Sequence, residues 1–581
     1  MNGSDISIRG AAATLVGGLL LALTPHAALP QQSCPDPDGF ADVAKGALAH
    51  VRYLADDALE GRAAASEGER CAAAYLADRL GALGLVPAGD HGAWLQSFSV
   101  RTGTAVEEAR LVISGADAGA AGAGWAPFGF SASGSVTAPL RVVSPPDPHA
   151  AHDVALGEAH GRIAVISVDG SVQVDAHFLA ASLARAGAAG MILLYPDAIP
   201  LPDPGSEIRP AVGVPSAAAT GRLAESVRRA AAARAEASIA VAAAPSMSEA
   251  RNVVALLPGD DPDRASEPII VGAHYDHLGR GGPGSLAPDS REIHNGADDN
   301  ASGTAALLEV ARRLSEGPGL DRPVLFVAFS GEERGLLGSA HFVSHPTRPI
   351  DGAVAMLNMD MVGRLRDEAL AVHGLGTAQE WDAILDAANS ATDRPLSITR
   401  VADGFGPSDH SSFYGAGVPV LFFFTNTHAD YHRPSDDWDS VNGEGIERVA
   451  GLVAEVVRRL AGDEAAPAPA ITLVRGAGNP HGAASGDEPA PSGYGPYLGS
   501  IPDMTPIEGG VRLTGVREGS PAEKAGLREG DVIVSFAGRD IDDLYAFTYA
   551  LRESEPGDAV DIVVLRDGEP VSLRAVLERR R

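Results

Sequence analysis

PIIVGAHYDHLG, residues 268–279, is the stretch from which the fold of this chain can be worked out. Its apolar first half is typical of a buried strand, and it ends abruptly in a histidine and a carboxylate. Downstream, the glycine-flanked pair Asp298-Asp299 precedes a helical pattern that begins at Ser302. Histidine and carboxylate side chains that directly follow a buried strand indicate metal binding rather than core packing.

Strand-like and helix-like patterns alternate around this stretch. The expected strands are Val253–Leu257, Ile269–Ala273, Val324–Phe329, Ala353–Leu357 and Val418–Phe424, and the expected helices are Ser302–Ser315, Glu380–Ala391 and Gly445–Leu460. Apolar strands separated by helices predict an α/β fold with a mixed, mainly parallel sheet and helices on both faces. Ligands of such sheets collect beyond the carboxyl ends of the strands. The residues that fall there are His274, Glu332, Glu333 and Asp360.

With 581 residues, the chain is too long for one hydrophobic core. Residues 35–100 have helical spacing, and residues 101–249 carry short strand–helix–strand patterns typical of a small α/β insert. Residues 463–494 contain few large apolar residues and are expected to form a flexible linker. Residues 495–581 alternate short strands with one helix, which predicts a small β-rich domain.

The N-terminus and the charge indicate where the chain works. Arg9, the apolar run Ala11–Leu23 and small residues to Pro30 are typical of a secretory signal, so we assign residues 1–30 to a signal peptide and expect a periplasmic or secreted protein. An uncleaved membrane anchor is the alternative. The net charge of −31 argues against a nucleic-acid partner. The two cysteines, Cys34 and Cys71, permit a disulfide or two free thiols.

Further metal-binding residue types follow other expected strands. They occur in Gly331-Glu332-Glu333-Arg334-Gly335, Asn358-Met359-Asp360-Met361 and Tyr431-His432-Arg433-Pro434-Ser435-Asp436. Each piece alone is explained by a helix cap, a solvated turn or a surface histidine. Their joint position at the ends of one predicted sheet favours a common site. Histidine and carboxylate ligands without cysteine suit zinc or a neighbouring divalent metal.

Together these motifs resemble the dizinc exopeptidases of the bacterial leucyl aminopeptidase and aminopeptidase Y group. The resemblance spans most of residues 252–460 and implies a zinc exopeptidase fold. Residues 35–100 would be the N-terminal part of this peptidase domain, and residues 250–462 its catalytic part.

The resemblance also implies a ligand set for two Zn²⁺ per chain, namely His274, Asp298, Glu333, Asp360 and His432. Asp298 would bridge the ions. His274 and Asp360 would complete one position, while Glu333 and His432 would complete the other. Asp276 and Asp299 would lie behind these ligands, where Asp276 orients His274 through its remaining ring nitrogen. A cis peptide bond is implied between Asp298 and Asp299.

The implied activity is removal of N-terminal residues from peptides, with a metal-bridging water and Glu332 as general base. Tyr431 would donate a hydrogen bond to the oxyanion, or would be a packed aromatic. A serine-hydrolase triad of Ser408, His410 and an aspartate is the competing interpretation, although no nucleophile-elbow motif accompanies it.

Three alternatives remain for the function. A carboxypeptidase on the same fold would need a cation for the substrate carboxylate, for which Arg364 or Arg433 is available. A glutaminyl-cyclase-like acyltransferase would use one metal. An inactive protein would bind partners through its accessory domains.

Two accessory domains resemble known modules. The run Arg185–Gly190, which leads into a hydrophobic strand, resembles part of a protease-associated domain and implies a role in substrate access. Ser520–Leu527, followed by Gly530–Ile533, resembles a bacterial-type PDZ domain. Tyr497-Leu498-Gly499 would then bind a peptide C-terminus, unless the domain serves only packing or oligomer contacts.

Overall fold

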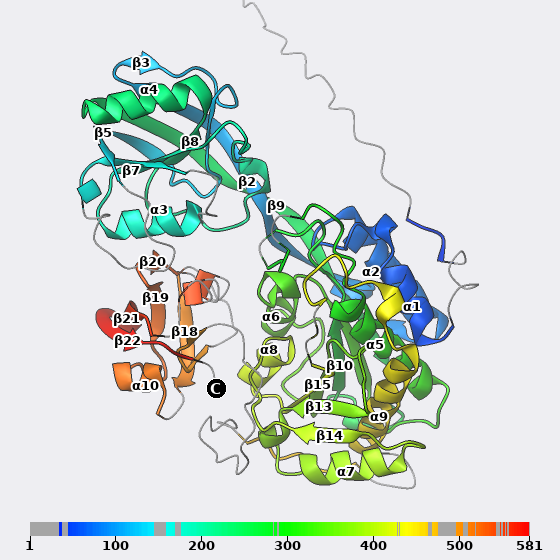
Figure 1. Cartoon of the computed structure of the whole chain (residues 1–581). Coiled ribbons are helices and arrows are strands. Elements are labelled where there is room, and N and C mark those ends of the chain that lie inside the picture. Colours follow the sequence, from blue (N-terminus) through cyan, green and yellow to red (C-terminus); the bar gives the residue numbers. More distant parts are fainter. Residues whose placement is uncertain are drawn as a thin grey trace, which may run out of the picture.

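The computed structural model forms three lobes: a large α/β domain, an insert and a small β-rich domain (Figure 1). It describes residues 34–37, 45–143, 158–168, 176–282, 284–287, 290–426, 428, 430–462, 468–474, 496–502, 509–516, 519–541, 546–547, 550–551, 554, 557–566 and 568–579. The signal peptide expected at residues 1–30 lies outside these residues. Within the described ranges, no helix has the length and apolar character needed to cross a bilayer.

The large domain is built on one sheet, with strand order β14, β13, β15, β12, β10, β11 and β9. Their bounds are β14 Ser397–Arg400, β13 Ala369–His373, β15 Val420–Phe424, β12 Ala355–Met359, β10 Ile269–His274, β11 Val324–Phe329 and β9 Glu236–Leu257, with β1 Val86–Pro87 paired to β9. The four strands from β15 to β11 are parallel, whereas β9 and β13 join antiparallel. The mixed, mainly parallel sheet expected from the sequence is confirmed.

Helices cover both faces of this sheet, as expected. Because successive side chains of a strand point to opposite faces, each central strand contributes to two cores. One core lies under α1 Ala47–Leu54, α2 Glu67–Ala82, α5 Gly303–Ser315, α7 Trp381–Ala391 and α9 Gly443–Ala461. The other lies under α6 Leu337–Ser344 and α8 His410–Gly415, where Phe329, Phe342 and Phe413 pack together.

A long two-stranded ribbon connects the sheet to the insert (Figure 1). Strand β2 Leu95–Ile113 pairs with β9 from Leu95 opposite Val253 to Ile113 opposite Ala237. The short strand expected at Val253–Leu257 is therefore the end of a 22-residue strand. Its first half is alanine-rich and contains Pro245, with Ile239 and Val241 as its only β-branched residues, which is why the local pattern did not indicate its length.

The insert is a small α/β layer on the far end of the ribbon. Its sheet contains β5 Gly134–Val142, β6 Ile163–Ser167, β7 Gly190–Leu194, β8 Ser216–Ala219 and β4 Trp125–Pro127, and β3 Ala116–Asp117 pairs with β2. Helix α3 Ala176–Arg185 packs on one face and α4 Gly221–Ala232 on the other. The strand–helix–strand pattern predicted for this region is therefore present.

The C-terminal lobe is a small antiparallel structure around its own core. Its elements are β16 Pro496–Tyr497, β17 Ser500–Pro502, β18 Val511–Val516, α10 Pro521–Ala525, β19 Val532–Phe536, β20 Arg539–Asp540, β21 Ala559–Arg566, β22 Glu569–Val576 and β23 Glu578–Arg579. It contacts the insert where the guanidinium of Arg185 donates to the carbonyl of Ala537.

Part of the segment expected to be a flexible linker packs against the large domain. Leu473 forms a β-bridge with Ala378, and the Val474 amide donates to the Thr377 carbonyl over 2.8 Å. Leu473 and Ile471 pack against the cores of the large domain. Residues 468–474 therefore correct the expectation of a free linker, because two apolar side chains suffice to dock them. Residues 463–467 and 475–495 lie outside the described residues.

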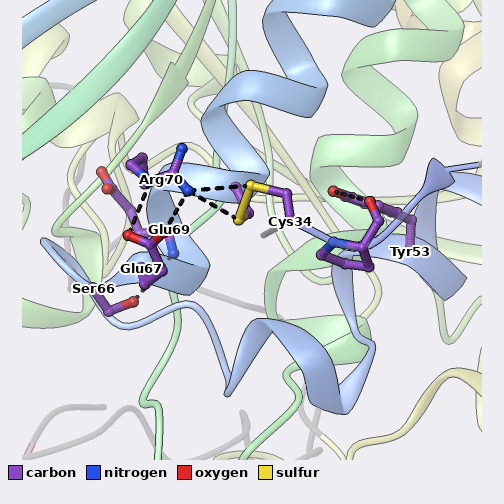
Figure 2. Close-up of a disulfide and its surroundings, with 8 residues drawn as sticks. Cys34, Tyr53, Ser66, Glu67, Glu69 and Arg70 are labelled. Carbon is purple, nitrogen blue, oxygen red and sulfur yellow. Dashed lines mark hydrogen bonds and ion pairs between the residues drawn. A yellow bond between two sulfur atoms is a disulfide. The ribbon is translucent and has the colours of Figure 1, made fainter. Parts of the chain in front are cut away.

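A disulfide joins Cys34 to Cys71 in α2, which resolves the choice left open by the sequence (Figure 2). Arg70 lies beside it, donating to Glu67 and, over 3.4 Å, to the Cys34 sulfur. Tyr53 of α1 donates to the Pro35 carbonyl over 3.5 Å. The segment around Cys34 is thereby fixed to the two N-terminal helices.

Replacing Cys34 and Cys71 by serine removes a cross-link between residues 37 positions apart. Because such a link restricts the unfolded chain, we expect the double variant to lose about 2–4 kcal/mol of unfolding free energy. Equilibrium denaturation under non-reducing conditions measures the difference. An unfolding free energy equal to that of the parent protein would contradict this expectation.

Candidate metal centre

Three parallel strands deliver the first side chains of the site to one edge of the sheet. His274 is the last residue of β10, and it lies opposite Phe329, the last residue of β11. The turn Glu332–Arg334 follows β11 directly, and Asp360 follows β12. Since the carboxyl ends of parallel strands share an edge, these residues lie close together as the sequence suggested.

The turn Ala297–Ser302 before α5 places two neighbouring aspartates in different surroundings. The Asp299 carboxylate lies between two histidines, with Oδ1 3.3 Å from His274 Nε2 and Oδ2 3.1 Å from His432 Nε2. Asp298 points elsewhere. Its Oδ1 accepts hydrogen bonds from the Gly363 amide and the Ser302 hydroxyl, and its Oδ2 lies 3.1 Å from His428 Nε2.

Asp299 rather than Asp298 therefore lies between the two histidines, so it is the residue that would hold two ions, and Asp298 lies behind it. The cis peptide bond lies between Asp299 and Asn300, one bond later than expected. Because residues 298 and 299 are both aspartate, residue type alone could not tell which of them faces the edge of the sheet. Asp436 fixes the arrangement, because its carboxylate accepts both amides, of Asp298 at 3.0 Å and of Asp299 at 3.1 Å.

The first candidate metal position lies among His274, Asp299 and Asp360. His274 Nε2 is 3.4 Å from Asp360 Oδ1. The other ring nitrogen of His274 contacts the backbone carbonyl of Asp276 at 3.2 Å, while the Asp276 carboxylate is 3.7 Å away. Asp276 thus orients His274 through its carbonyl rather than through its carboxylate. That carboxylate instead accepts the Glu332 amide at 3.1 Å.

The second candidate position lies beside Asp299 and Glu333, where His277 and His432 both approach. His432 Nε2 is 3.2 Å from Glu333 Oε2, and its Nδ1 contacts the Gly284 carbonyl at 2.7 Å. Such a carbonyl fixes the ring orientation of a metal-binding histidine. His277 also lies here, with Nδ1 2.6 Å from Glu333 Oε1. No sequence motif assigns a role to His277, which directly follows Asp276.

The side chains at both positions fit a divalent metal. Burial without a hydrogen bond is costly for a polar atom, so such atoms call for a bound partner. Among the described residues, His274 Nε2 and Asp360 Oδ1 are buried and have no hydrogen-bond partner, while His277 Nδ1 and Glu333 Oε1 lie 2.6 Å from each other. Imidazole and carboxylate donors without a thiolate suit zinc.

Arg62, a buried arginine to which no sequence motif points, holds the two loops in place. Arg62 is fully buried, and its guanidinium donates to the carbonyls of Tyr275 at 2.9 Å and of Gly296 at 3.0 Å, besides those of Leu54 and Asn295. Tyr275 follows His274, and Gly296 precedes the aspartate turn. Arg62 therefore joins the ends of the two metal-binding segments. In sequence it lies in a short charged loop with no distinguishing motif.

The two residues predicted to act in catalysis both lie at the centre. Glu332 Oε2 is 3.9 Å from His274 Nε2, and burial raises the pKa of Glu332 well above its ordinary value. The Tyr431 ring stacks on the His432 ring with centroids 3.8 Å apart. Burial also raises the pKa of Tyr431, so its hydroxyl stays protonated as a donor.

The alternative serine triad lacks its essential contact. His410 stacks on Phe422 with ring centroids 4.5 Å apart, and both of its ring nitrogens are without a hydrogen-bond partner among the described residues. Ser408 instead accepts a hydrogen bond from Asn358 at 2.8 Å. Burial lowers the pKa of His410 to about 3. A Ser408–His410 pair is therefore not formed.

The geometry defines an α/β protein with two adjoining groups of candidate metal-binding side chains at the carboxyl edge of its sheet. Residues 252–457 match the model of Peptidase family M28, and residues 496–577 match that of a PDZ domain. The chain therefore carries an M28 peptidase domain followed by a PDZ domain.

Individual proteins resemble parts of the chain. Aminopeptidase YwaD of Bacillus subtilis is 32% identical over 200 residues, which are 32% of this chain and 40% of that protein. Leucine aminopeptidase 1 of Uncinocarpus reesii is 29% identical over 202 residues, 32% of this chain and 48% of that protein. The chain thus spans about half the length of the curated relatives it matches. The solved structure of a zinc aminopeptidase from B. subtilis covers 72% of this chain and 96% of its own, with 24% identity and a TM-score of 0.48.

Replacing each of the two neighbouring aspartates by asparagine tests which one binds metal. We expect Asp299→Asn to weaken metal binding at both positions, by more than the ~10–100-fold that replacement of an outer residue costs. Asp298→Asn is the matched control, because it makes the same charge change one residue away and retains an oxygen acceptor. Metal titration of both variants measures this. Full loss in Asp298→Asn with retention in Asp299→Asn would reverse the assignment.

Proposed function

We propose that this chain is a zinc-dependent aminopeptidase that holds two zinc ions and removes N-terminal residues from peptides. The observation that carries the proposal is the Asp299 carboxylate, which lies between His274 and His432 at the edge of an M28 peptidase domain. A single carboxylate facing two imidazoles is suited to hold two cations a short distance apart.

Bound zinc would supply Lewis-acid polarisation of the scissile carbonyl and would lower the pKa of a water molecule. Glu332 accepts the proton from the attacking water and returns it to the leaving amine. Its position is set at both ends, because Asp276 holds its backbone amide and its carboxylate faces His274. Tyr431, fixed against His432, donates to the oxyanion that forms on the substrate.

The charges around the site favour an aminopeptidase over a carboxypeptidase. Arg364 was the buried candidate for binding a substrate carboxylate, but its Nη2 pairs with Asp430 and Asp436, each at 3.2 Å. Arg433, the other candidate, is exposed to solvent. The donor sets for two metal positions argue against a glutaminyl-cyclase-like enzyme, and the presence of Glu332 argues against an inactive protein.

We also propose that the insert, as a protease-associated module, adjusts access to the site. Arg334, next to ligand Glu333, donates to the Arg101 carbonyl on the ribbon at 2.8 Å. On the same stretch, the Thr104 hydroxyl donates to Glu207 of the insert at 3.2 Å. A displacement of the insert would therefore reach the turn that carries Glu332.

The PDZ domain would bind a peptide C-terminus or a protein partner. Export to an oxidising compartment is proposed as well, and the Cys34–Cys71 disulfide supports it.

Glu332→Gln removes the proton acceptor but keeps the side-chain shape. We expect the turnover number to fall by about 10²–10⁴-fold, with metal content unchanged. Steady-state kinetics and metal analysis of the same preparation measure both quantities. Glu249→Gln, on the exposed ribbon, is the control for a neutralised glutamate. Retention of most activity by Glu332→Gln would remove Glu332 from the mechanism.

The specificity is tested with aminoacyl anilides, N-blocked peptides and peptides that can be cleaved only from the carboxyl end. We expect cleavage of the free-amine substrates alone, loss of cleavage with a chelator, and recovery with added zinc. Cleavage only from the carboxyl end would replace the proposal by a carboxypeptidase. Activity that persists in chelator would contradict a metal-dependent reaction.

A further inference from the structure

Glu69 is a buried glutamate that takes no part in the metal centre itself. It lies in α2, and its exposed fraction is 0%. Its Oε1 accepts a hydrogen bond from the Arg251 amide of β9 at 2.9 Å and lies 2.8 Å from the Tyr275 hydroxyl oxygen. Tyr275 directly follows His274, the last residue of β10. Glu69 therefore joins the strand that forms the ribbon to the residue beside a candidate metal ligand.

The hydroxyl of Tyr275 lies between two oxygen atoms. It is 2.8 Å from Glu69 Oε1 and 2.5 Å from the carbonyl oxygen of Arg251. A phenol has one proton to donate, and a carbonyl oxygen has none. The shorter contact therefore requires the Tyr275 proton, because two oxygens without a proton between them repel at this distance. The longer contact then requires a proton from Glu69, whose protonated oxygen can donate to Tyr275 and still accept the Arg251 amide.

The surroundings of Glu69 also favour its neutral form. Burial raises the pKa of Glu69 to about 7, although hydrogen bonds and the charge of Arg251 oppose the rise. The Arg251 guanidinium lies 3.5 Å from Glu69 Oε2, but it also pairs with the exposed Glu249 at 2.8 Å and is itself partly exposed. It therefore compensates a negative charge on Glu69 only in part. The groups that face Glu69 from β10 and from the end of β11 are the neutral hydroxyls of Tyr275 and Ser330, with the Asp276 carboxylate close to Tyr275.

We propose that Glu69 carries a proton in the folded chain and, through Tyr275, positions the candidate metal ligand His274. This inference rests on the zinc-dependent function proposed above. The Tyr275 backbone is held by Arg62 at its carbonyl and by the Phe329 carbonyl at its amide, so the hydroxyl is a third point of attachment. When Glu69 loses its proton, one of the two contacts of that hydroxyl no longer has a hydrogen bond. The end of β10 is then held less firmly, and zinc affinity falls as the pH rises.

Infrared spectroscopy of the protein tests the protonation directly, because a protonated carboxyl group has a carbonyl stretch that a carboxylate lacks. Below about pH 7 the parent should show a band that is absent from Glu69→Gln, and this difference should disappear above that pH. Glu309→Gln is the matched control, because Glu309 is also buried but is paired with Arg312 at 2.6 Å and with Arg313 at 2.9 Å. Its replacement should remove no such band. If Glu69→Gln likewise removes none, Glu69 is ionised and the inference is overturned.

Titration with Zn²⁺ in competition with a chromophoric chelator tests the positioning role. As the pH rises through about 7, the affinity of the parent should fall about fivefold relative to that of Glu69→Gln, the effect of one lost hydrogen bond. Comparison at each pH cancels the protonation of the metal ligands, which both proteins share. Tyr275→Phe keeps the ring and removes the hydroxyl, so it should lack the same pH dependence and gives a second test if Glu69→Gln does not fold.

Affinities of the parent and both variants that keep a constant ratio across this pH range would overturn the positioning role. Failure to cleave peptides, by contrast, would contradict only the proposed function, because neither the infrared band nor the zinc affinity depends on turnover.

Discussion

The structure depends on holding several carboxylates together in a buried volume at one edge of a parallel sheet. Glu332, Glu333 and Asp360 lie with Asp299 around His274 and His432, and like charges at this spacing repel strongly away from water. Such a cluster persists only if cations compensate it. The chain itself supplies Arg62, and the unpartnered donor atoms suit divalent cations as further compensation.

Buried charged residues hold the carboxylates together by binding the backbone of the loops that carry them. Arg62 donates to carbonyls on both sides of the site, and Asp436 receives the two amides of the aspartate turn. Arg364 in turn pairs with Asp436. These buried charges therefore hold the loops that carry the candidate ligands, and they do not contact the candidate ligand oxygens themselves.

The sequence predicted the parts of the fold that follow from a strong local pattern. Strand β11 and helix α5 lie where the apolar spacing placed them, and the strand-end rule brought His274 and Asp360 together. The length of β9 could not be predicted because its alanine-rich half resembles a linker or a helix. Docking of residues 468–474 depends on contacts with distant residues, which a local pattern does not contain.

The prediction of individual site residues from the sequence was limited for a similar reason. Residue types identified a metal centre, but the choice between Asp298 and Asp299 depends on the backbone path of one turn, and the role of Arg62 depends on four carbonyls brought together only by folding. His277 was visible in the sequence, but its proximity to Glu333 depends on packing over Gly296.

The most direct test of the central claim is anomalous X-ray diffraction, at the zinc edge, from crystals of the zinc-loaded chain. The account predicts two peaks, one on each side of the Asp299 carboxylate, with His274 and Asp360 around one and Glu333 and His432 around the other. A single peak, or peaks bound by Asp298 with Asp299 turned away, would contradict it.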